Sequence, residues 1–439
     1  MMMTNLKKLN NNLKRQKIKR RRSFELEEKE TAAEKRKRLY DEFLENTRVA
    51  LRREGEEEGA EFDEDSLLAR RLQAQQLEDS GRRCRYIASR VQNPKTTQGG
   101  GFELVVKHRQ SVTVAVLSED DSIVFSASKD GSIRQSHLDH DHDHGGKTEE
   151  TYYAQQGRAV LALAVTSDGR YLASAGFDRD IHLWDTRTRQ HIQAFSGHKG
   201  PISCLTFRQG TSELFSGSYD RMVKIWNVED RSYVTTLFGH QSHVLSIDCL
   251  RKERVLTAAR DRTMHLWKVP EESQLVFRAP ASSLECCCFI NNDEILSGSD
   301  DGSIEHWSVL RKKPLHIIKN AHSLSTPNTL EVKQIHDLSN DCKGPSACSW
   351  VSSVAVCRGS DLAASGAGNG VVRLWEIEKD AKGVQPLFEL PLVGYVNSLA
   401  FAKSGKFLVA GVGKEHRLGR WGSLPAARNG VAVHPLQLS

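Results

Sequence analysis

Six of the seven tryptophans in this 439-residue chain end the same recurring phrase. In each copy, small residues lead into a turn with an aspartate or a related polar residue, and an alternating segment then ends in tryptophan. The clearest copy runs from Phe215 to Trp226, and others end at Trp184, Trp267 and Trp307. Strict alternation is typical of a β-strand with one buried face. The chain is therefore predicted to be built from a repeated β-unit.

The spacing of the phrase predicts how these units assemble. The interval is 42 residues from Trp184 to Trp226, 41 to Trp267 and 40 to Trp307. A period of about 40 residues with this signature is typical of a WD-repeat β-propeller, in which each unit forms one four-stranded blade. The interval grows to 68 residues before Trp375, so we expect a long insertion between the fifth and sixth blades.

Three degraded copies of the phrase bring the expected number of blades to seven. Ser126–Asp130 opens the first blade, in which Ser136 occupies the tryptophan position. Ser365–Asn369 leads to the tryptophan of the sixth blade, and Gly411–Glu415 leads to Trp421 in the seventh. The predicted fold is therefore an all-β, seven-bladed WD-repeat β-propeller.

The ring is expected to close with a strand from its N-terminal side, because an open sheet edge invites stray pairing. Phe102–Val106 is predicted to be the outer strand of the last blade, whose inner strands are Val396–Phe401 and Phe407–Gly411. The expected organisation is a basic disordered arm, an extension of one or two α-helices, the propeller and a C-terminal tail, over residues 1–38, 39–99, 100–425 and 426–439.

Two sets of polar residues have the spacing of a buried hydrogen-bond network within a blade. Buried polar groups are costly unless they are paired, so a satisfied network makes a blade rigid. The sets are His198, Ser216, Asp220 and Trp226, and His240, Thr257, Asp261 and Trp267. We interpret them as structural and not as hydrolase triads, and no other nucleophile–base set or phosphate-binding glycine loop indicates an enzyme.

The first 22 residues are rich in Lys and Arg and have few apolar side chains, so they cannot bury enough surface to fold alone. We interpret this run as a nuclear or nucleolar localisation signal that also attracts RNA phosphates, the alternative being a solubilising tail. Its candidate residues are Lys14, Arg15, Lys17, Lys19, Arg20, Arg21 and Arg22. The helices expected after it dock either on a partner or on the propeller rim, and the sequence leaves both open.

Composition excludes several other classes of protein. The nine cysteines contain no CxxC pair, so a disulfide framework and a zinc site are not expected. No apolar run has the length of a membrane span. His137 begins a His/Asp-rich segment that extends to His144, which we interpret as a solvated insertion and not as a metal site. No metal, cofactor or membrane partner is therefore expected.

The turn of the last blade contains an unusual number of hydrogen-bond donors. Lys414, His416, Arg417 and Arg420 surround Glu415 in a glycine-rich hairpin. Arginine binds phosphate in a bidentate manner and stacks on unpaired bases, which suits RNA recognition. The alternative is that some of these residues brace the ring closure by pairing with Glu415. Further candidates for RNA or partner contact are Arg260, Arg262 and Arg221, on turns of neighbouring blades.

Several segments resemble the WD-repeat protein family of the U-three small nucleolar ribonucleoprotein (U3 snoRNP). They are Pro391–Leu399, Phe407–Trp421, Tyr233–Gln241, Pro270–Phe277, Glu34–Tyr40 and Ala69–Arg82. The resemblance implies a non-catalytic nucleolar protein of the small-subunit processome, which acts in ribosomal RNA precursor processing. It implies U-three RNA, the box C/D proteins with their kink-turn-binding protein, and processome proteins as partners, with precursor RNA contacted indirectly.

Two departures and one alternative accompany this resemblance. Ala279–Pro280 stands where the fifth blade should have a Gly-His pair, and Ser136 replaces a tryptophan, which questions the stability of those blades. Leu172–Asp178 with Asp185 and Arg187 also resembles the box by which some WD proteins bind a cullin ubiquitin ligase. A substrate receptor of such a ligase is therefore the alternative function.

Overall fold

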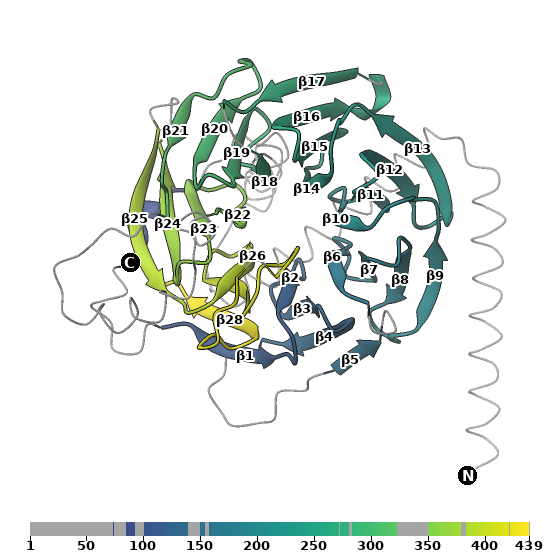
Figure 1. The fold of residues 1–439 in the computed structure, drawn as a ribbon, viewed down its shortest axis with the longest axis horizontal. Helices are drawn as coiled ribbons and strands as arrows, with labels where there is room; N and C mark the ends of the chain where they lie inside the picture. The colour runs from purple at the N-terminus through teal and green to yellow at the C-terminus, as the bar shows by residue number, and fades with distance from the viewer. Residues whose placement is uncertain are drawn as a thin grey trace, which may run out of the picture. The chain divides into compact units, whose positions relative to one another are not determined.

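In the part of the chain that the structure describes, seven four-stranded antiparallel sheets surround a common axis (Figure 1). The first strand of each sheet lies nearest the axis and the fourth lies on the circumference (Figure 1). This arrangement confirms the predicted seven-bladed propeller. Each inner strand packs beside the inner strands of the neighbouring blades, so the ring itself forms the core.

The structure is a computed structural model of residues 85–92, 101–138, 150–153, 158–271, 273–280, 283–322, 350–378, 383–420 and 422–438, together with Gln73. Apart from Gln73, these residues belong to one unit that spans 79–439. The basic run with its localisation-signal residues, most of the expected helical extension, the segment 139–149 and the insertion 323–349 lie outside the described residues. None of the described helices has the length and apolar character that a membrane span needs.

The first three blades are formed by β2 (Val112–Leu117), β3 (Ile123–Ser128), β4 (Ser132–His137) and β5 (Glu150–Tyr153); β6 (Val160–Val165), β7 (Tyr171–Gly176), β8 (Ile181–Asp185) and β9 (His191–Phe195); and β10 (Ile202–Phe207), β11 (Glu213–Ser218), β12 (Met222–Asn227) and β13 (Ser232–Phe238).

The next three are formed by β14 (Val244–Cys249), β15 (Arg254–Ala259), β16 (Thr263–Lys268) and β17 (Ser273–Arg278); β18 (Leu284–Phe289), β19 (Glu294–Ser299), β20 (Ile304–Ser308) and β21 (His316–Ile318); and β22 (Ser353–Val356), β23 (Leu362–Gly366), β24 (Val371–Ile377) and β25 (Val384–Pro391). Two short 3-10 helices are described, η1 (Ala88–Arg90) and η3 (Val269–Glu271).

The seventh blade closes the ring with strands from both ends of the described unit. Its order is β26 (Tyr395–Phe401), β27 (Phe407–Gly413), β28 (Gly430–Pro435) and β1 (Glu103–Lys107). β1 is the outer strand, as expected. The third strand is β28 and not a segment ending at Trp421, so the expectation that the propeller ends near residue 425 was wrong. Residues 414–429 are instead a long loop inserted between β27 and β28.

The N-terminal limit of the propeller also lies earlier than the expected residue 100. Arg85 N–H donates to the Gly359 carbonyl at 2.7 Å, and the Asp361 carboxylate accepts from the amides of Ile87 and Ala88 at 2.8 and 3.0 Å. Ile87, Ala88 and Val91 are buried in the apolar core of the sixth and seventh blades. Residues 85–92 therefore form a strap that belongs to the propeller.

The two predicted polar networks are present as hydrogen-bonded sets inside the third and fourth blades. His198 Nε2 lies 2.8 Å from Ser216 Oγ, and Trp226 Nε1 donates to the same oxygen at 2.9 Å. The other ring nitrogen of His198 lies 2.8 Å from Asp220. In the fourth blade His240, Thr257, Asp261 and Trp267 repeat these contacts. Because these hydroxyls are fully buried and paired, the sets hold the turns of the blade to its strands.

The fifth blade compensates for its missing histidine. The buried Glu305 carboxylate accepts from the hydroxyls of Ser297, Ser299 and Ser303 at 2.7, 2.7 and 2.9 Å. Trp307 still donates to Ser297 Oγ at 2.8 Å. Glu305 therefore takes the place of the histidine as the buried partner of Ser297, and the contact between Trp307 and Ser297 is kept in spite of the departure at Ala279–Pro280. Glu305 was not predicted from its position in the repeat.

One face of the ring carries all the turns between second and third strands, because successive strands in each blade alternate in direction. We call it the turn face. Its turns are Lys129–Gly131, Phe177–Asp180, Tyr219–Arg221, Arg260–Arg262, Asp300–Gly302, Ala367–Gly370 and, in the seventh blade, the loop 414–429. The strap 85–92 contacts the opposite face, at the turns that contain Gly359 and Lys403.

Candidate nucleic-acid interface

The turns of the first six blades share one backbone design on the turn face. In the third blade, Asp220 Oδ1 accepts from the amide of Met222 at 3.0 Å. The residue between them, Arg221, has φ of 70° and donates its N–H to the Ser218 carbonyl at 3.2 Å. The turn therefore requires a left-handed residue after the aspartate, a conformation that costs non-glycine residues about 1 kcal/mol or more.

Glycine meets this requirement in three blades and arginine in the other three. Gly131, Gly302 and Gly370 have φ of 85, 81 and 82° in the first, fifth and sixth blades. Arg179, Arg221 and Arg262 have φ of 73, 70 and 66° in the second, third and fourth. Strained backbone is retained where the surrounding structure or a function favours it. Three consecutive blades thus carry an arginine at a position where glycine is less strained.

These three arginines are exposed, and a fourth lies beside them. Arg260 is exposed one residue before Asp261, in the same turn as Arg262. Arg221, Arg260 and Arg262 were predicted as candidates from the sequence, and Arg179 was not. The signal for Arg179 was present, since Asp178-Arg179 repeats the dipeptides Asp220-Arg221 and Asp261-Arg262 at the same place in the phrase. We call the four residues Arg179, Arg221, Arg260 and Arg262 the arginine arc.

His416, a candidate in the seventh blade, is directed into the protein. Its side chain is buried, its ring meets those of Trp350 and Tyr395 edge-on, and its Nδ1 accepts from the Leu418 amide at 3.3 Å. Burial, together with the positive charge of Arg417 and then Lys129, lowers the pKa of His416 from 6.5 to about 3. The imidazole is therefore neutral near pH 7 and serves as packing for the loop.

Arg417 spans the ring. Its guanidinium donates to the Leu245 carbonyl at 2.6 Å, and its backbone N–H donates to Asn397 at 2.9 Å. Leu245 lies on β14 of the fourth blade, across the ring axis from the seventh. A second arginine, Arg358 of the sixth blade, donates to Asp248 of the fourth at 2.8 Å near the other end of β14. Arg417 is thus part of the internal bracing of the propeller.

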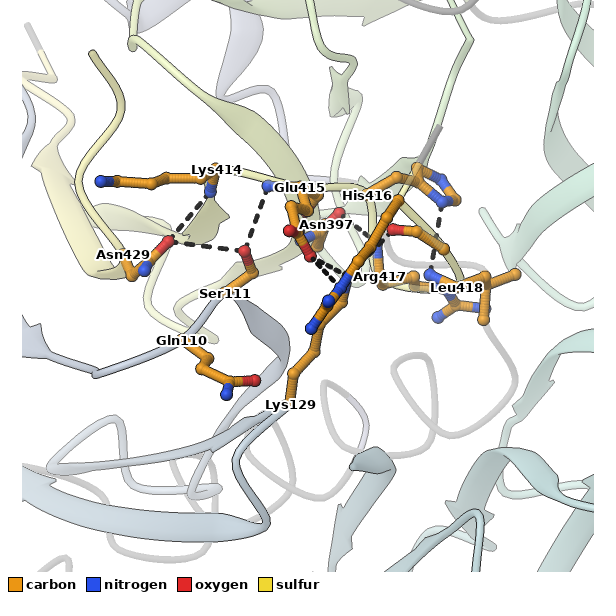
Figure 2. A network of polar contacts seen from close by, with 12 residues as sticks. Gln110, Ser111, Lys129, Asn397, Lys414, Glu415, His416, Arg417, Leu418 and Asn429 are labelled. Atoms are coloured by element: carbon orange, nitrogen blue, oxygen red, sulfur yellow. Dashed lines mark hydrogen bonds and ion pairs between the residues drawn. The ribbon is translucent and has the colours of Figure 1, made fainter. Parts of the chain in front are cut away.

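Glu415 ties the loop to the first blade (Figure 2). Its carboxylate accepts from the Lys129 ammonium at 2.9 Å and lies 3.4 Å from Arg420 Nε. Lys129 also donates to the Gly419 carbonyl at 2.9 Å. The alternative interpretation, in which some of these residues brace the ring closure, therefore describes the contact of Glu415 with Lys129 and the contact of Arg417 across the ring.

Two of the four donors in this loop remain on the surface. The Lys414 side chain is exposed and extends away from the network, whereas its backbone N–H donates to Asn429 at 2.9 Å (Figure 2). Arg420 has 76% of its side chain exposed. The turn face therefore offers Lys414 and Arg420 at the seventh blade and the arginine arc at the second to fourth.

Two other sequence features are Asp185 and the His/Asp-rich segment. Asp185 accepts from the amides of Arg187 and Thr188 at 2.8 and 3.0 Å, so it caps the turn between β8 and β9. Asp185 therefore has a structural role within its own blade. Most of the His/Asp-rich segment that begins at His137 lies outside the described residues.

Comparison with known proteins extends these observations. The family model for the WD domain, G-beta repeat, matches residues 103–135, 146–185, 189–227, 231–268, 271–308 and 337–376. The U3 snoRNP-associated protein-like EMB2271 of Arabidopsis thaliana is 55% identical over 425 residues, which cover 93% of this chain and 86% of that protein. The chain belongs to the family of U3 snoRNP-associated WD-repeat proteins.

Members of this family extend beyond plants. The human U3 small nucleolar RNA-interacting protein 2 is 39% identical over 421 residues, covering 93% of this chain and 83% of that protein. A crystal structure of the RRP9 WD40 repeats superposes with a TM-score of 0.70 at 40% identity and covers 79% of this chain and 99% of that one. The resemblance found in the sequence is thereby confirmed, and the family shares the propeller described above.

Proposed function

We propose that this chain is a non-catalytic RNA-binding and scaffold component of the U3 small nucleolar ribonucleoprotein, which acts in processing of the small-subunit ribosomal RNA precursor in the nucleolus. The observation that carries the proposal is family membership over nearly the whole chain, since relatives at 55 and 39% identity are named for association with the U3 particle or for interaction with its RNA.

The arginine arc supports the RNA-binding part of the proposal. Guanidinium groups bind phosphate through paired hydrogen bonds and lose little entropy on binding, because their planar fork is rigid. Arg179, Arg221 and Arg262 are exposed and keep a strained left-handed backbone, and among the described residues none of them forms an ion pair. The mechanism is positioning: the turn face holds folded RNA while the rigid ring contacts proteins of the particle.

The proposed partners are U3 RNA, the box C/D proteins with their kink-turn-binding protein, and processome proteins. Precursor RNA is engaged indirectly, through pairing with U3 RNA. The basic run at residues 14–22 is proposed to direct the chain to the nucleus and nucleolus and to add electrostatic affinity for RNA.

The test combines RNA recovery with variants of the arc. A tagged chain should co-purify with U3 RNA, and its depletion should cause uncleaved precursor RNA to accumulate. The variant Arg179→Gly/Arg221→Gly/Arg262→Gly should recover at least tenfold less U3 RNA while its melting temperature stays the same or rises. A matched control, Arg187→Gly/Arg189→Gly/Arg231→Gly, removes three arginines outside the turn face and should recover normal amounts.

Two results would contradict the proposal. If the wild-type chain recovers no U3 RNA, or if precursor cleavage is normal after depletion, the assignment to the particle is wrong. If the arc variant recovers as much RNA as the control, the arc is not the RNA-binding surface.

A further inference from the structure

An aromatic pair lies within the arginine arc. The rings of Tyr219 and His243 are stacked with their centroids 4.5 Å apart and their planes 7° from parallel. Tyr219 belongs to the turn of the third blade, and His243 to the segment that leads into β14 of the fourth. Both side chains are partly exposed. The pair therefore forms a partly exposed aromatic stack at the junction of two blades.

Backbone hydrogen bonds hold the two segments that carry these rings. The Tyr219 N–H donates to the Pro201 carbonyl at 2.9 Å, and the His243 carbonyl accepts from Arg260 N–H at 2.9 Å. Adding a Cβ at Gly200 would place it 2.9 Å from the backbone nitrogen of Asp220, so the chain beside the Tyr219 turn is closely packed. Because little ordering remains to be done on binding, this surface is preorganised for a planar ligand.

Charged groups of both signs lie near the aromatic pair. Burial and then the guanidiniums of Arg260 and Arg221 lower the pKa of His243, so these two cations lie near its ring. Burial raises the pKa of Tyr219, and Arg417 acts against this shift. The buried Glu285 carboxylate lies on the fifth-blade side, and burial raises its pKa. A phosphate beside the rings is therefore attracted by Arg221 and Arg260, whereas Glu285 disfavours an anion close to its own carboxylate.

We propose that Tyr219 and His243 capture one unpaired nucleotide of the bound RNA, with its base extending the ring stack and its phosphate on Arg221 and Arg260. This inference rests on the proposed function, which supplies RNA as the ligand. Proteins recognise single-stranded RNA by stacking bases on aromatic side chains and arginine planes. A base within a duplex is stacked on its neighbours on both sides, so the site selects loops, bulges or ends.

An acidic protein segment is the competing occupant, since it would also bind the arginines. It would not use the flat face of the aromatic pair, whereas a nucleotide uses both features at once. The observations favour the nucleotide, because the stacked rings and the two cations meet at one place.

The test uses the full-length chain and transcribed U3 RNA, with dissociation constants measured at several salt concentrations. His243→Ala should weaken binding by about tenfold, in line with alanine substitution of a base-stacking side chain. His243→Phe keeps a flat ring and should restore most of the affinity. Both should leave the salt dependence unchanged, whereas Arg221→Gly should reduce its slope by about one. Ultraviolet crosslinking and mass spectrometry should recover a Tyr219 or His243 peptide joined to a nucleotide.

A matched control comes from the same blade. Tyr233, on β13, has 51% of its surface exposed and lies on the circumference, so Tyr233→Ala removes an exposed aromatic ring outside the turn face. It should bind RNA as the wild type does. Only variants whose melting temperature matches that of the wild type are compared, so that loss of fold is not mistaken for loss of contact with RNA.

The outcomes separate the two proposals. If the wild-type chain does not bind U3 RNA, the proposed function fails and this site fails with it. If the wild type binds but His243→Ala binds equally well, or if His243→Phe is as weak as His243→Ala, the stacking site is wrong and the function stands. Equal competition by a fully paired RNA duplex or by a poly-glutamate peptide would also overturn the site.

Discussion

Arginines occur in two regions of the turn face, the loop of the seventh blade and the turns of the second to fourth, and their surroundings differ. In the seventh-blade loop, Arg417 donates to Leu245 across the ring and Arg420 lies beside Glu415. In the other turns, Arg221 and Arg262 stand exposed on left-handed backbone. Both regions have the composition of an RNA-binding turn.

The difference shows what decides the role of an arginine on a propeller. A guanidinium that reaches a carbonyl or a carboxylate of another blade stabilises the ring, and its donors are then occupied. Arg221 and Arg262 stand on short turns and form no ion pair among the described residues, so we expect them to be available to phosphate. The fold decides how many hydrogen-bond acceptors lie near each guanidinium. The number of these acceptors therefore distinguishes an arginine that stabilises the ring from one that can bind RNA.

The largest effect is expected at Arg417. Arg417→Ala should lower the free energy of unfolding by about 2 to 3 kcal/mol, because it removes a charge-assisted hydrogen bond that joins opposite blades. Urea unfolding followed by tryptophan fluorescence measures this loss. If stability were unchanged while U3 RNA binding was lost, Arg417 would belong with the arc and the comparison would fail.

The next effect is the response of the seventh-blade loop to acid. The pKa of His416 is about 3 in the folded protein, against an ordinary 6.5, so the unfolded chain takes up the proton first as pH falls. The contribution of neutral His416 to the free energy of unfolding is complete above pH 6.5 and is lost between pH 6.5 and about 3. About 2 kcal/mol of it is lost by pH 5. As pH falls from 7 to 5, the wild type should lose about 2 kcal/mol more unfolding free energy than His416→Phe.

That comparison is specific because other histidines titrate in both proteins. Burial lowers the pKa of His108 and of His322 to about 4, so both add to the acid sensitivity of the wild type and of the variant. Equal pH slopes in the two proteins would show that His416 is not held neutral by the fold.

A smaller effect of opposite sign is expected in the turns. Arg221→Gly should raise the free energy of unfolding by up to about 1 kcal/mol, because glycine adopts a left-handed φ without strain. The reverse change, Gly370→Ala, should lower it by about 1 kcal/mol, since a Cβ there meets open space and only the backbone is strained. Thermal unfolding of both variants measures these two changes in stability. A loss of stability in Arg221→Gly would mean that Arg221 has a structural role.

The smallest effect is expected at Arg420. Its side chain is 76% exposed and its contact to Glu415 is 3.4 Å, so Arg420→Ala should change the free energy of unfolding by less than about 0.5 kcal/mol. The same denaturation experiment as for Arg417→Ala provides the comparison. A large loss here would place Arg420 in the bracing network.

The sequence predicted the propeller well for identifiable reasons. Tryptophans at regular intervals and the His–Ser–Asp sets repeat in register, and each set is a contact within one blade, so local spacing was enough to find it. The strand β28 was missed because no tryptophan marks it and a 16-residue loop precedes it. The strap 85–92 was missed because its contacts join it to residues more than 270 positions away.

The candidate site was predicted only in part. The aspartate–arginine dipeptides were visible, but Arg179 was not recognised until its backbone conformation was seen beside those of Arg221 and Arg262. The pairing of Tyr219 with His243 gave no signal, because the two residues are 24 positions apart and belong to different blades.

The repeat period by itself determined that this chain forms blades and that seven of them close a ring, because alternation and spacing act over neighbouring residues. The tertiary structure alone decided which cations face outward, since a guanidinium finds or lacks an acceptor only after distant blades meet. His416 is buried and Arg417 donates to a carbonyl of the opposite blade, whereas the arginines of the second to fourth blades lie on the surface.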